Sequence, residues 1–294
     1  MWIIVTLVAA GFQTARTALQ HRLRALLSVS GAGFVRYVYG APLAGLAVLV
    51  AWAAGVEWPH IAPRFWPVIT FGGVAQILGT IFLIRAFDAR DFAVGTVFAK
   101  TEVVQVAVFS LVLLGEPLGW GGWVGAVVCM VGVAMLATKG RALSWAAVRE
   151  PAARYGLAAG GMFGLASIGI RGATKALTDS PTVMRAIVTL AVMNTIQIVV
   201  HGGYLLAREP EQLRLSFVHW RSSSVVGVLS VCGSAGWALA LALQNAAKVR
   251  TLGQVELLFA FGVSHWLLHE RHTRAEYVAS ALVAAGVITV VIAG

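Results

Sequence analysis

Two pairs of glutamates stand out because acidic residues are rare in this chain. Only 12 of its 294 residues are Asp or Glu. Glu102 and Glu116 are 14 residues apart, and Glu256 and Glu270 repeat that spacing 154 residues later. Glu102 and Glu256 lie inside apolar segments, where an unpaired carboxylate costs about 2.5–3.5 kcal/mol on membrane-insertion scales. We therefore expect each of them to face a cavity, to pair with a cation or to hold a proton.

The composition sets the environment in which these acids act. Hydrophobic residues make up 59% of the chain, whereas charged residues make up 12%, about half the fraction in a typical soluble protein. We therefore expect an integral membrane protein. The net charge of +10 does not indicate nucleic-acid binding, because the Lys and Arg residues lie in short gaps between apolar runs. Cys129 and Cys232 both lie in apolar segments, so we predict no disulfide framework, no metal site and no cofactor.

Helices that span the membrane must position the acids, and each such helix needs about 20 mostly apolar residues. The chain holds ten such segments, and short connections join most of them. The first, sixth and ninth segments are the least apolar because they contain charged residues. The ten segments cover residues 2–20, 30–54, 65–86, 92–114, 119–138, 154–175, 182–206, 219–243, 250–268 and 275–293.

The spacing of the acids is part of a longer internal repeat. At the same displacement of 154 residues, Ser110 falls on Ser264 and Gly132-Val133 falls on Gly286-Val287. We predict a first five-helix repeat at 1–139, a connecting loop at 140–153 and a second repeat at 154–294. Because five is odd, the two repeats have opposite orientations in the membrane. Inverted repeats are typical of secondary transporters, whose substrate site lies near the bilayer midplane.

The segment that follows each apolar acid resembles a known transporter motif. The residues that carry the resemblance are Leu113-Leu114-Gly115-Glu116-Pro117-Leu118 with Gly125 and Gly132-Val133, the second copy Leu267-Leu268-His269-Glu270 with Gly286-Val287, and Arg36. The whole chain thereby resembles the ten-helix, EamA type of the drug/metabolite transporter superfamily. In the second copy, Arg271 stands in place of the proline.

The resemblance implies that helices 1–4 and 6–9 surround a central cavity and that helices 5 and 10 are peripheral. It also implies transport, often export, of small metabolites such as amino acids, or of drugs. The chain departs from the family pattern in one respect. Members often carry a proline midway along helices 4 and 9, near the places that Glu102 and Glu256 occupy here, so we expect these two helices to be straighter.

Six residues are candidates for binding the substrate or the coupling proton. Arg16 is a candidate partner for a substrate carboxylate or for Glu102, and the alternative for both glutamates is a buried ion pair that locks helices together. The alternative for Lys100 is a partner on a neighbouring helix. The six candidates are Glu102, Glu256, Arg16, Lys100, Gln13 and Gln105.

Seven further residues are candidates for lining the cavity that the resemblance implies. Small and hydroxyl residues also serve as packing contacts between membrane helices, and arginines near helix starts can extend to the membrane surface, so these alternatives stay open. The seven residues are Gln76, Thr80, Ser230, Ser234, Trp237, Arg36 and Arg185.

These features favour an all-α integral membrane protein that works by alternating access. Carboxylates and cations within the membrane would suit a zwitterion, so we predict a proton-coupled exporter of amino acids. The alternative in the same class is a multidrug or cation efflux transporter. An integral-membrane enzyme or a lipid-handling protein is the alternative from another class, but the sequence lacks a convincing cluster of nucleophile, metal ligands or acid and base. The expected partners are a small-molecule substrate and membrane lipid, and both a monomer and a homodimer stay open.

The Lys and Arg residues of the connections predict the orientation. We expect a multi-pass protein of a bacterial inner membrane. Twelve Lys or Arg residues lie on one side of the ten segments, whereas the other side has Arg64, Lys175, Lys248 and Arg250. Because cytoplasmic connections are enriched in Lys and Arg, we predict that both termini are outside the cytoplasm.

Overall fold

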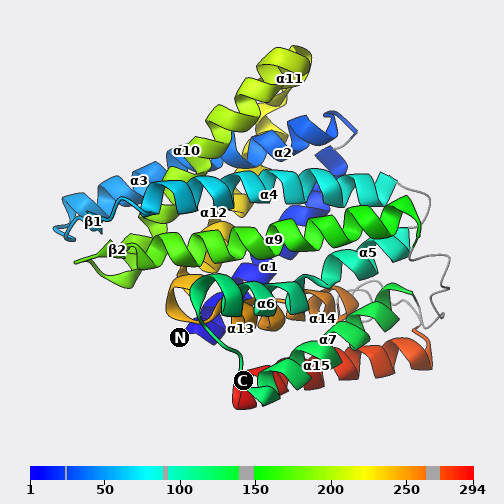
Figure 1. The fold of residues 1–294 in the computed structure, drawn as a ribbon. Helices are drawn as coiled ribbons and strands as arrows, with labels where there is room; N and C mark the ends of the chain where they lie inside the picture. Colours follow the sequence, from blue (N-terminus) through cyan, green and yellow to red (C-terminus); the bar gives the residue numbers. More distant parts are fainter. Residues whose placement is uncertain (24, 89–91, 139–148, 263–271) are drawn as a thin grey trace. The chain divides into compact units, whose positions relative to one another are not determined.

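A computed structural model describes residues 1–23, 25–88, 92–138, 149–262 and 272–294, and these residues fold almost entirely into helices (Figure 1). Two short strands, β1 (His60–Ile61) and β2 (Leu177–Thr178), pair antiparallel. The helices are α1 (Trp2–Leu23), α2 (Val29–Val38), α3 (Gly40–Ala53), α4 (Phe65–Asp88), α5 (Phe92–Lys100), α6 (Glu102–Leu114), α7 (Trp120–Ala137), α9 (Pro151–Lys175), α10 (Thr182–Arg208), α11 (Pro210–Val218), α12 (Trp220–Leu243), α13 (Ala246–Leu252), α14 (Val255–Gly262) and α15 (Arg274–Ala293).

Within the described residues, seven helices are long and apolar enough to cross a membrane. They are Val29–Ala53, Phe65–Ala86, Val94–Leu114, Trp120–Ala137, Thr182–Arg208, Trp220–Leu243 and Arg274–Ala293. The first, sixth and ninth predicted segments are not among the seven. They fall on α1, on α9 and on the pair α13 and α14, which contain more polar residues, and the ninth continues into residues 263–268, outside the described part. A multi-pass membrane protein is confirmed, whereas ten helices in inverted repeats stay a prediction.

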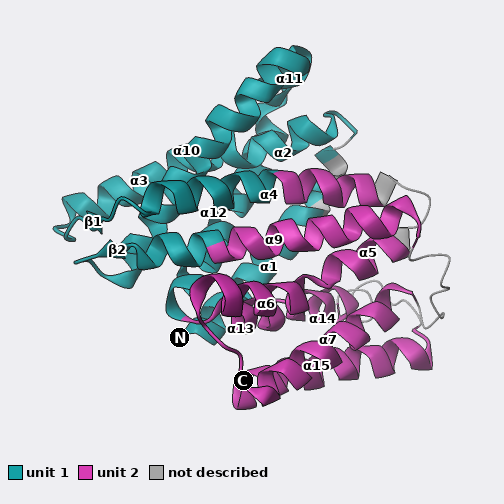
Figure 2. Cartoon of the chain, in the orientation of Figure 1, with its two compact units in different colours: residues 1–77, 169–243 teal, residues 78–168, 244–294 magenta. Residues whose placement is uncertain are grey.

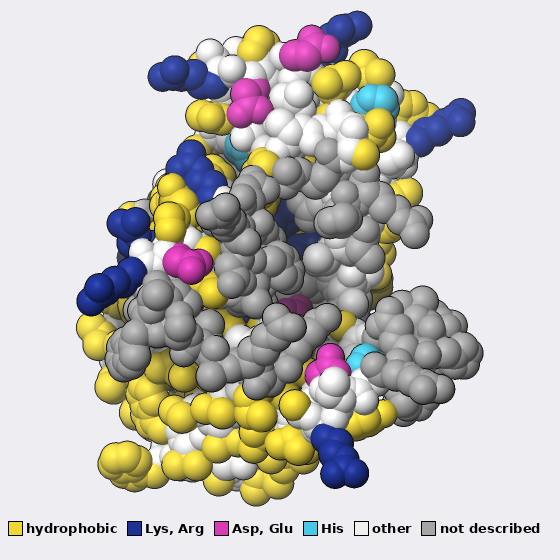
Figure 3. Space-filling model, turned by 90° about the vertical axis from the view of Figure 1, so that its right-hand side faces the viewer, with side chains coloured by type: hydrophobic (Ala, Val, Ile, Leu, Met, Phe, Trp, Pro, Cys, Tyr) yellow, Lys and Arg dark blue, Asp and Glu magenta, His cyan; other side chains and the backbone are white. Residues whose placement is uncertain are grey.

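Many large apolar side chains lie on the surface of the described helices. Trp120 is 88% exposed, Ile292 is 79% exposed and Val112 is 70% exposed. Figure 3 shows one face on which hydrophobic side chains cover much of the described surface and Lys and Arg side chains project outwards. A soluble protein would leave such a surface in contact with water. The acyl chains of a bilayer solvate it without that cost.

The chain folds into two compact units, which Figure 2 colours separately. Unit 1 consists of residues 1–77 and 169–243, and unit 2 consists of residues 78–168 and 244–294. Each unit therefore draws residues from both predicted repeats. The repeat boundaries at 1–139 and 154–294 describe a sequence pattern and stay a prediction.

In unit 2, α7 and α15 pack closely through glycines. A Cβ atom added at Gly286 would lie 2.4 Å from the backbone nitrogen of Cys129 and 2.6 Å from the carbonyl oxygen of Gly125. Gly132 faces α15 at similarly short range, since an added Cβ atom would lie 2.7 Å from the backbone nitrogen of Val283. Small residues allow this approach, and van der Waals packing then holds the two helices together in lipid.

Replacing Gly286 by Ala is expected to destabilise the protein by about 1–3 kcal/mol, the usual cost of overpacking, because backbone atoms cannot rotate away from the added methyl group. The melting temperature in detergent measures this effect. Gly203→Ala in α10 is the matched control, since no atom lies within 4 Å of its added Cβ. A melting temperature of Gly286→Ala equal to that of the control would contradict the close packing of α7 and α15.

Two of the helices of unit 2 are interrupted in the middle. The chain leaves α5 at Lys100 and enters α6 at Glu102, and Gly253 and Gln254 separate α13 from α14. The expectation that the helices of Glu102 and Glu256 are straighter than in other family members is therefore wrong. At the first break the Thr101 hydroxyl donates to the carbonyl oxygen of Phe98 at 2.6 Å, and such local hydrogen bonds compete with helical ones. Interrupted membrane helices occur where the backbone lines a binding site.

Candidate functional site

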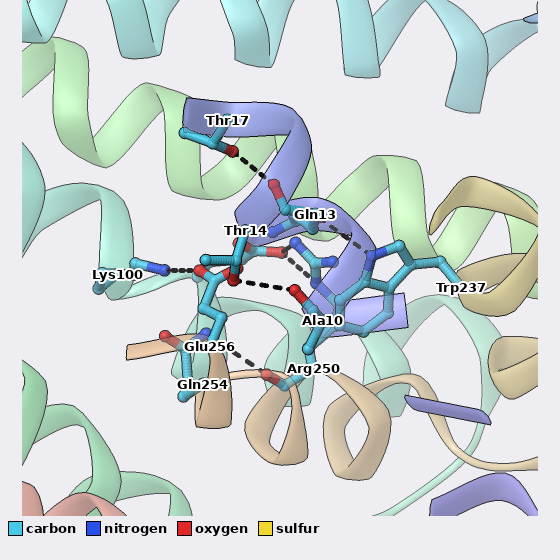
Figure 4. A network of polar contacts seen from close by, with 10 residues as sticks. Ala10, Gln13, Thr14, Thr17, Lys100, Trp237, Arg250, Gln254 and Glu256 are labelled. Atoms are coloured by element: carbon cyan, nitrogen blue, oxygen red, sulfur yellow. Dashed lines mark hydrogen bonds and ion pairs between the residues drawn. The ribbon is translucent and has the colours of Figure 1, made fainter. Parts of the chain in front are cut away.

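Two ion pairs connect the interrupted helices of unit 2. Arg250 donates from Nε to Oε1 of Glu102 at 2.6 Å, and its Nη2 contacts the same oxygen. Lys100 donates from Nζ to Oε1 of Glu256 (Figure 4). Each pair thus joins a residue of the first predicted repeat to a residue of the second. We call these four residues the crossed pairs.

All four side chains of the crossed pairs are largely withdrawn from solvent. Glu102 is the most buried, with 7% of its side chain exposed, whereas Glu256 and Arg250 are each 16% exposed and Lys100 is 20% exposed. Taking ions out of water costs several kcal/mol for each ion, which the attraction within a pair barely offsets. The crossed pairs therefore contribute little net free energy to holding the two helices together.

The helix ends explain why each charge lies where it does. Lys100 is in the last turn of α5 and Arg250 is in the last turn of α13, while Glu102 and Glu256 are in the first turns of α6 and α14. Cations are favoured at helix C-termini and anions at N-termini, by about 0.3–1 kcal/mol each. The interruptions thus provide matching dipole ends for all four charges.

Uncharged polar groups surround the first interruption. Gln105 donates from Nε2 to Oγ1 of Thr101 at 2.7 Å and to the carbonyl oxygen of Leu157 in α9 at 3.3 Å. Gly160 of α9 comes close as well, because a Cβ atom there would lie 2.7 Å from the carbonyl oxygen of Ala99. The predicted candidates Glu102, Lys100 and Gln105 therefore gather at one break in unit 2.

Several of the other predicted residues form polar contacts within unit 1. Trp237 donates from Nε1 to Oε1 of Gln13 at 3.0 Å (Figure 4). Gln76 accepts a hydrogen bond of 2.8 Å from Gln197, which also donates to the carbonyl oxygen of Gly73 at 3.2 Å. The first contact joins the cavity candidate Trp237 to the binding candidate Gln13, and the second joins the cavity candidate Gln76 to Gln197. Both contacts are compatible with the packing alternative and with a cavity.

Four more of the predicted residues differ in their burial. Ser230 in unit 1 and Thr80 in unit 2 are buried, while Ser234 and Arg16 in unit 1 are half-buried. Glu102 pairs with Arg250, a residue that was not among the candidates. The pairing of Arg16 with Glu102 stays a prediction.

Arg36, in the last turn of α2, and Arg185, in the first turn of α10, have different surroundings. Arg185 donates to the carbonyl oxygen of Leu177 at 3.2 Å and to Oγ1 of Thr182 at 3.0 Å, so it ties the first turn of α10 to β2. Arg36 is buried, and its guanidinium carbon lies 5.6 Å from the ring centre of Tyr37. Neither arginine extends away from the protein as the alternative reading assumed.

Arg250 is a charged residue of the candidate site that the sequence did not single out. We counted it among the charges of a connection, because the ninth apolar segment was taken to begin there. The structure places it inside α13, after an Asn245 side chain that accepts from the backbone nitrogen of Ala247 at 2.8 Å. Asparagine is a preferred residue at a helix N-cap. Asn245 was therefore the signal that a helix already includes Arg250.

Metal chemistry finds no support in the described residues, which contain no group of three His, Cys, Asp or Glu side chains that could hold an ion. The polar groups of the site can pair with charges, donate or accept hydrogen bonds and exchange protons.

Comparison with known proteins gives a family match for residues 1–138. Residues 1–138 match the family model of EamA-like transporters. A solved structure described as "Crystal structure of protein" has a TM-score of 0.74 and 15% sequence identity, and the match covers 98% of this chain and 94% of that chain. At this identity the likeness shows the fold alone. No curated protein matches the chain in sequence. The resemblance to the EamA type is thus confirmed over residues 1–138.

Proposed function

We infer from the membership of residues 1–138 in the EamA-like transporter family that the protein is a membrane transporter of the drug/metabolite type. We propose that it exports amino acids across a bacterial inner membrane by alternating access. The interrupted helices α5–α6 and α13–α14 occupy matching places in the two predicted repeats, since Glu102 and Glu256 are 154 residues apart. Inverted repeats with interrupted helices at the site are the arrangement that alternating access uses.

The observation that carries this proposal is the set of crossed pairs. A zwitterion presents one ammonium and one carboxylate group, and both find partners of opposite charge among two acids and two cations. On binding, the substrate replaces interactions within the crossed pairs, so every buried charge keeps a partner. A cationic drug would leave Lys100 or Arg250 without a carboxylate, which is costly in a membrane interior. The charges therefore favour amino acids over cations.

Glu102 is our candidate for the proton-coupling residue. It is the most buried of the four charged side chains of the crossed pairs. When the substrate amine leaves, a proton can take its place on Glu102. Glu256 is more exposed and serves the substrate rather than the proton. The mechanism is an exchange of proton and substrate at one carboxylate.

We further propose that both termini lie outside the cytoplasm. Of the four cations assigned to the second side, Lys175 lies in α9 and Lys248 and Arg250 lie in α13, which leaves Arg64 in a connection. Six of the twelve cations on the first side also lie in helices, namely Arg22, Arg154, Arg208, Arg214, Arg221 and Arg274, which leaves six. The excess of Lys and Arg on the first side then favours that side as cytoplasmic. A C-terminal reporter that is active only in the cytoplasm is expected to be silent, and a strong signal would reverse the orientation.

A ligand screen of the purified protein in detergent tests the substrate class. A ligand that binds only the folded state raises the melting temperature, by an amount that corresponds to about 2.7 kcal/mol at 100 times its dissociation constant. We expect neutral amino acids to raise it, and their amides, which lack the carboxylate, to have no effect. If cationic drugs alone raise it, the protein is an efflux transporter and the amino-acid proposal is wrong.

A further inference from the structure

A second polar cluster lies in unit 1, where α2 and α10 meet. Its members are Arg36, Tyr37 and His201, which are 8%, 2% and 4% exposed. The ring centres of Tyr37 and His201 are 6.0 Å apart, and the guanidinium carbon of Arg36 lies 5.6 Å from the ring centre of Tyr37. All three residues belong to unit 1, whereas the crossed pairs belong to unit 2.

The polar atoms of this cluster lack hydrogen-bond partners among the described residues. They are Nε of Arg36, the hydroxyl oxygen of Tyr37, and both Nδ1 and Nε2 of His201. A buried polar atom without a partner costs about 1–3 kcal/mol, and more when it is charged. Several such atoms side by side in a native fold call for an ion, a water molecule or a ligand that the chain itself does not provide.

Because Arg36 is positively charged, we expect the missing partner of this cluster to be an anion. An arginine stays protonated in a protein, so it cannot escape burial by losing its charge. No carboxylate pairs with Arg36 among the described residues, and Glu209 at the end of α10 accepts a hydrogen bond of 2.7 Å from the hydroxyl of Ser28. A water molecule would satisfy Tyr37 and His201 but would leave the charge of Arg36 uncompensated.

The position of the cluster along α2 and α10 bears on which kind of anion can bind there. Arg36 lies seven residues from the start of α2, and His201 lies seven residues from the end of α10. These two ends are neighbours, because the backbone nitrogen of Ser28 donates to Gln212 at 2.7 Å. Seven residues of helix span about 10 Å, and half of the hydrocarbon layer is about 15 Å thick. The cluster therefore lies about 10 Å of helix from these two ends, within the two spanning segments Val29–Ala53 and Thr182–Arg208.

We propose that Arg36, Tyr37 and His201 form a binding site for the carboxylate group of a small organic acid. The planar guanidinium matches a carboxylate in charge and geometry, and the tyrosine hydroxyl and a histidine N–H donate to its remaining lone pairs. The rings of Phe34 and Tyr204 lie 6.1 Å and 6.4 Å from the ring of His201, so an aromatic acid suits the site. This site goes beyond the proposed export of amino acids and does not depend on it.

Thermal titration of the full-length protein in detergent tests the site, with benzoate as the probe and benzamide as its neutral analogue of the same shape. Ionic strength is held constant with sodium chloride. Benzoate is expected to raise the melting temperature and benzamide is not. In Arg36→Gln the dissociation constant of benzoate is expected to rise at least about tenfold, as for the loss of a charged hydrogen bond. Tyr37→Phe, which keeps the ring, is expected to weaken benzoate binding by a smaller factor.

The control variant is Arg208→Gln, which removes an exposed arginine from the same helix as His201 and is expected to leave the benzoate titration unchanged. Arg36→Gln removes a buried charge that has no acidic partner among the described residues, so it is expected to fold. Equal responses to benzoate and benzamide, or a benzoate response that survives in Arg36→Gln and Tyr37→Phe, would overturn the site. Stabilisation through Arg36 by inorganic phosphate but not by benzoate would overturn the carboxylate assignment.

Discussion

Glu102→Gln is expected to lower the stability of the protein by about 3–5 kcal/mol, because it leaves the guanidinium of Arg250 buried without its carboxylate. The double variant Glu102→Gln/Arg250→Gln removes both charges, so we expect it to recover most of the lost stability. Melting temperatures of the two variants and the wild type in the same detergent measure this difference. The recovery is the signature of a buried pair, since independent residues would have additive effects.

An exposed ion pair of the same chain provides the control for this comparison. Glu211 and Arg214 form a pair of 3.5 Å on the surface of α11, where their side chains are 63% and 73% exposed. Glu211→Gln is expected to change stability by less than about 1 kcal/mol, as surface pairs do. If Glu102→Gln melts at the same temperature as Glu211→Gln, Glu102 does not form the buried pair with Arg250.

Reversing the second crossed pair is expected to have the next largest effect. Lys100→Glu places a new carboxylate against Glu256 and close to Glu102, so the single variant is expected to be strongly destabilised or to fail to fold. The double variant Lys100→Glu/Glu256→Lys restores an attractive pair. It is expected to regain most of the stability but not all of it, because each charge now opposes the helix end that holds it, at about 0.3–1 kcal/mol each.

Transport by the reversed variant distinguishes a binding role from a structural role. If Lys100 and Glu256 contact the substrate, Lys100 binds its carboxylate and Glu256 binds its ammonium group. In the double variant these two charges are exchanged, so each substrate group meets a charge of its own sign. We therefore expect the folded double variant to lose amino-acid uptake into vesicles. Uptake at the wild-type rate would show that this pair only fastens the two helices.

The apolar runs of the sequence predict the position of the helices because burial in lipid depends on local composition. Ten runs were found, and described helices occupy each of them. Helix α11 was taken as part of a connection, although Pro210 in its first turn and Glu211 next to it are typical of a helix start. The run alone could not show that the helix of Thr101 is interrupted, since neither Gly nor Pro marks the place.

The residues of the candidate site could likewise be predicted only in part from the sequence. Glu102, Glu256 and Lys100 could be selected because charges are costly inside apolar segments, and this property is local. Their pairing is not local, since Lys100 and Glu256 are 156 residues apart. Which cation meets which acid depends on how α5–α6 and α13–α14 pack, and no sequence spacing encodes that. Arg36 and His201 likewise meet only in the folded unit.

Amino-acid exchange by the double variant Glu102→Gln/Arg250→Gln tests the central claim most directly. Reconstituted vesicles are loaded with an unlabelled amino acid that stabilises the wild-type protein, and the uptake of the same labelled amino acid is measured with and without a pH gradient. The double variant keeps its stability but lacks one carboxylate and one cation of the crossed pairs. We predict that its exchange falls to the level of empty vesicles. Exchange at the wild-type rate with normal pH dependence would contradict the assignment of the crossed pairs as the site of substrate and proton.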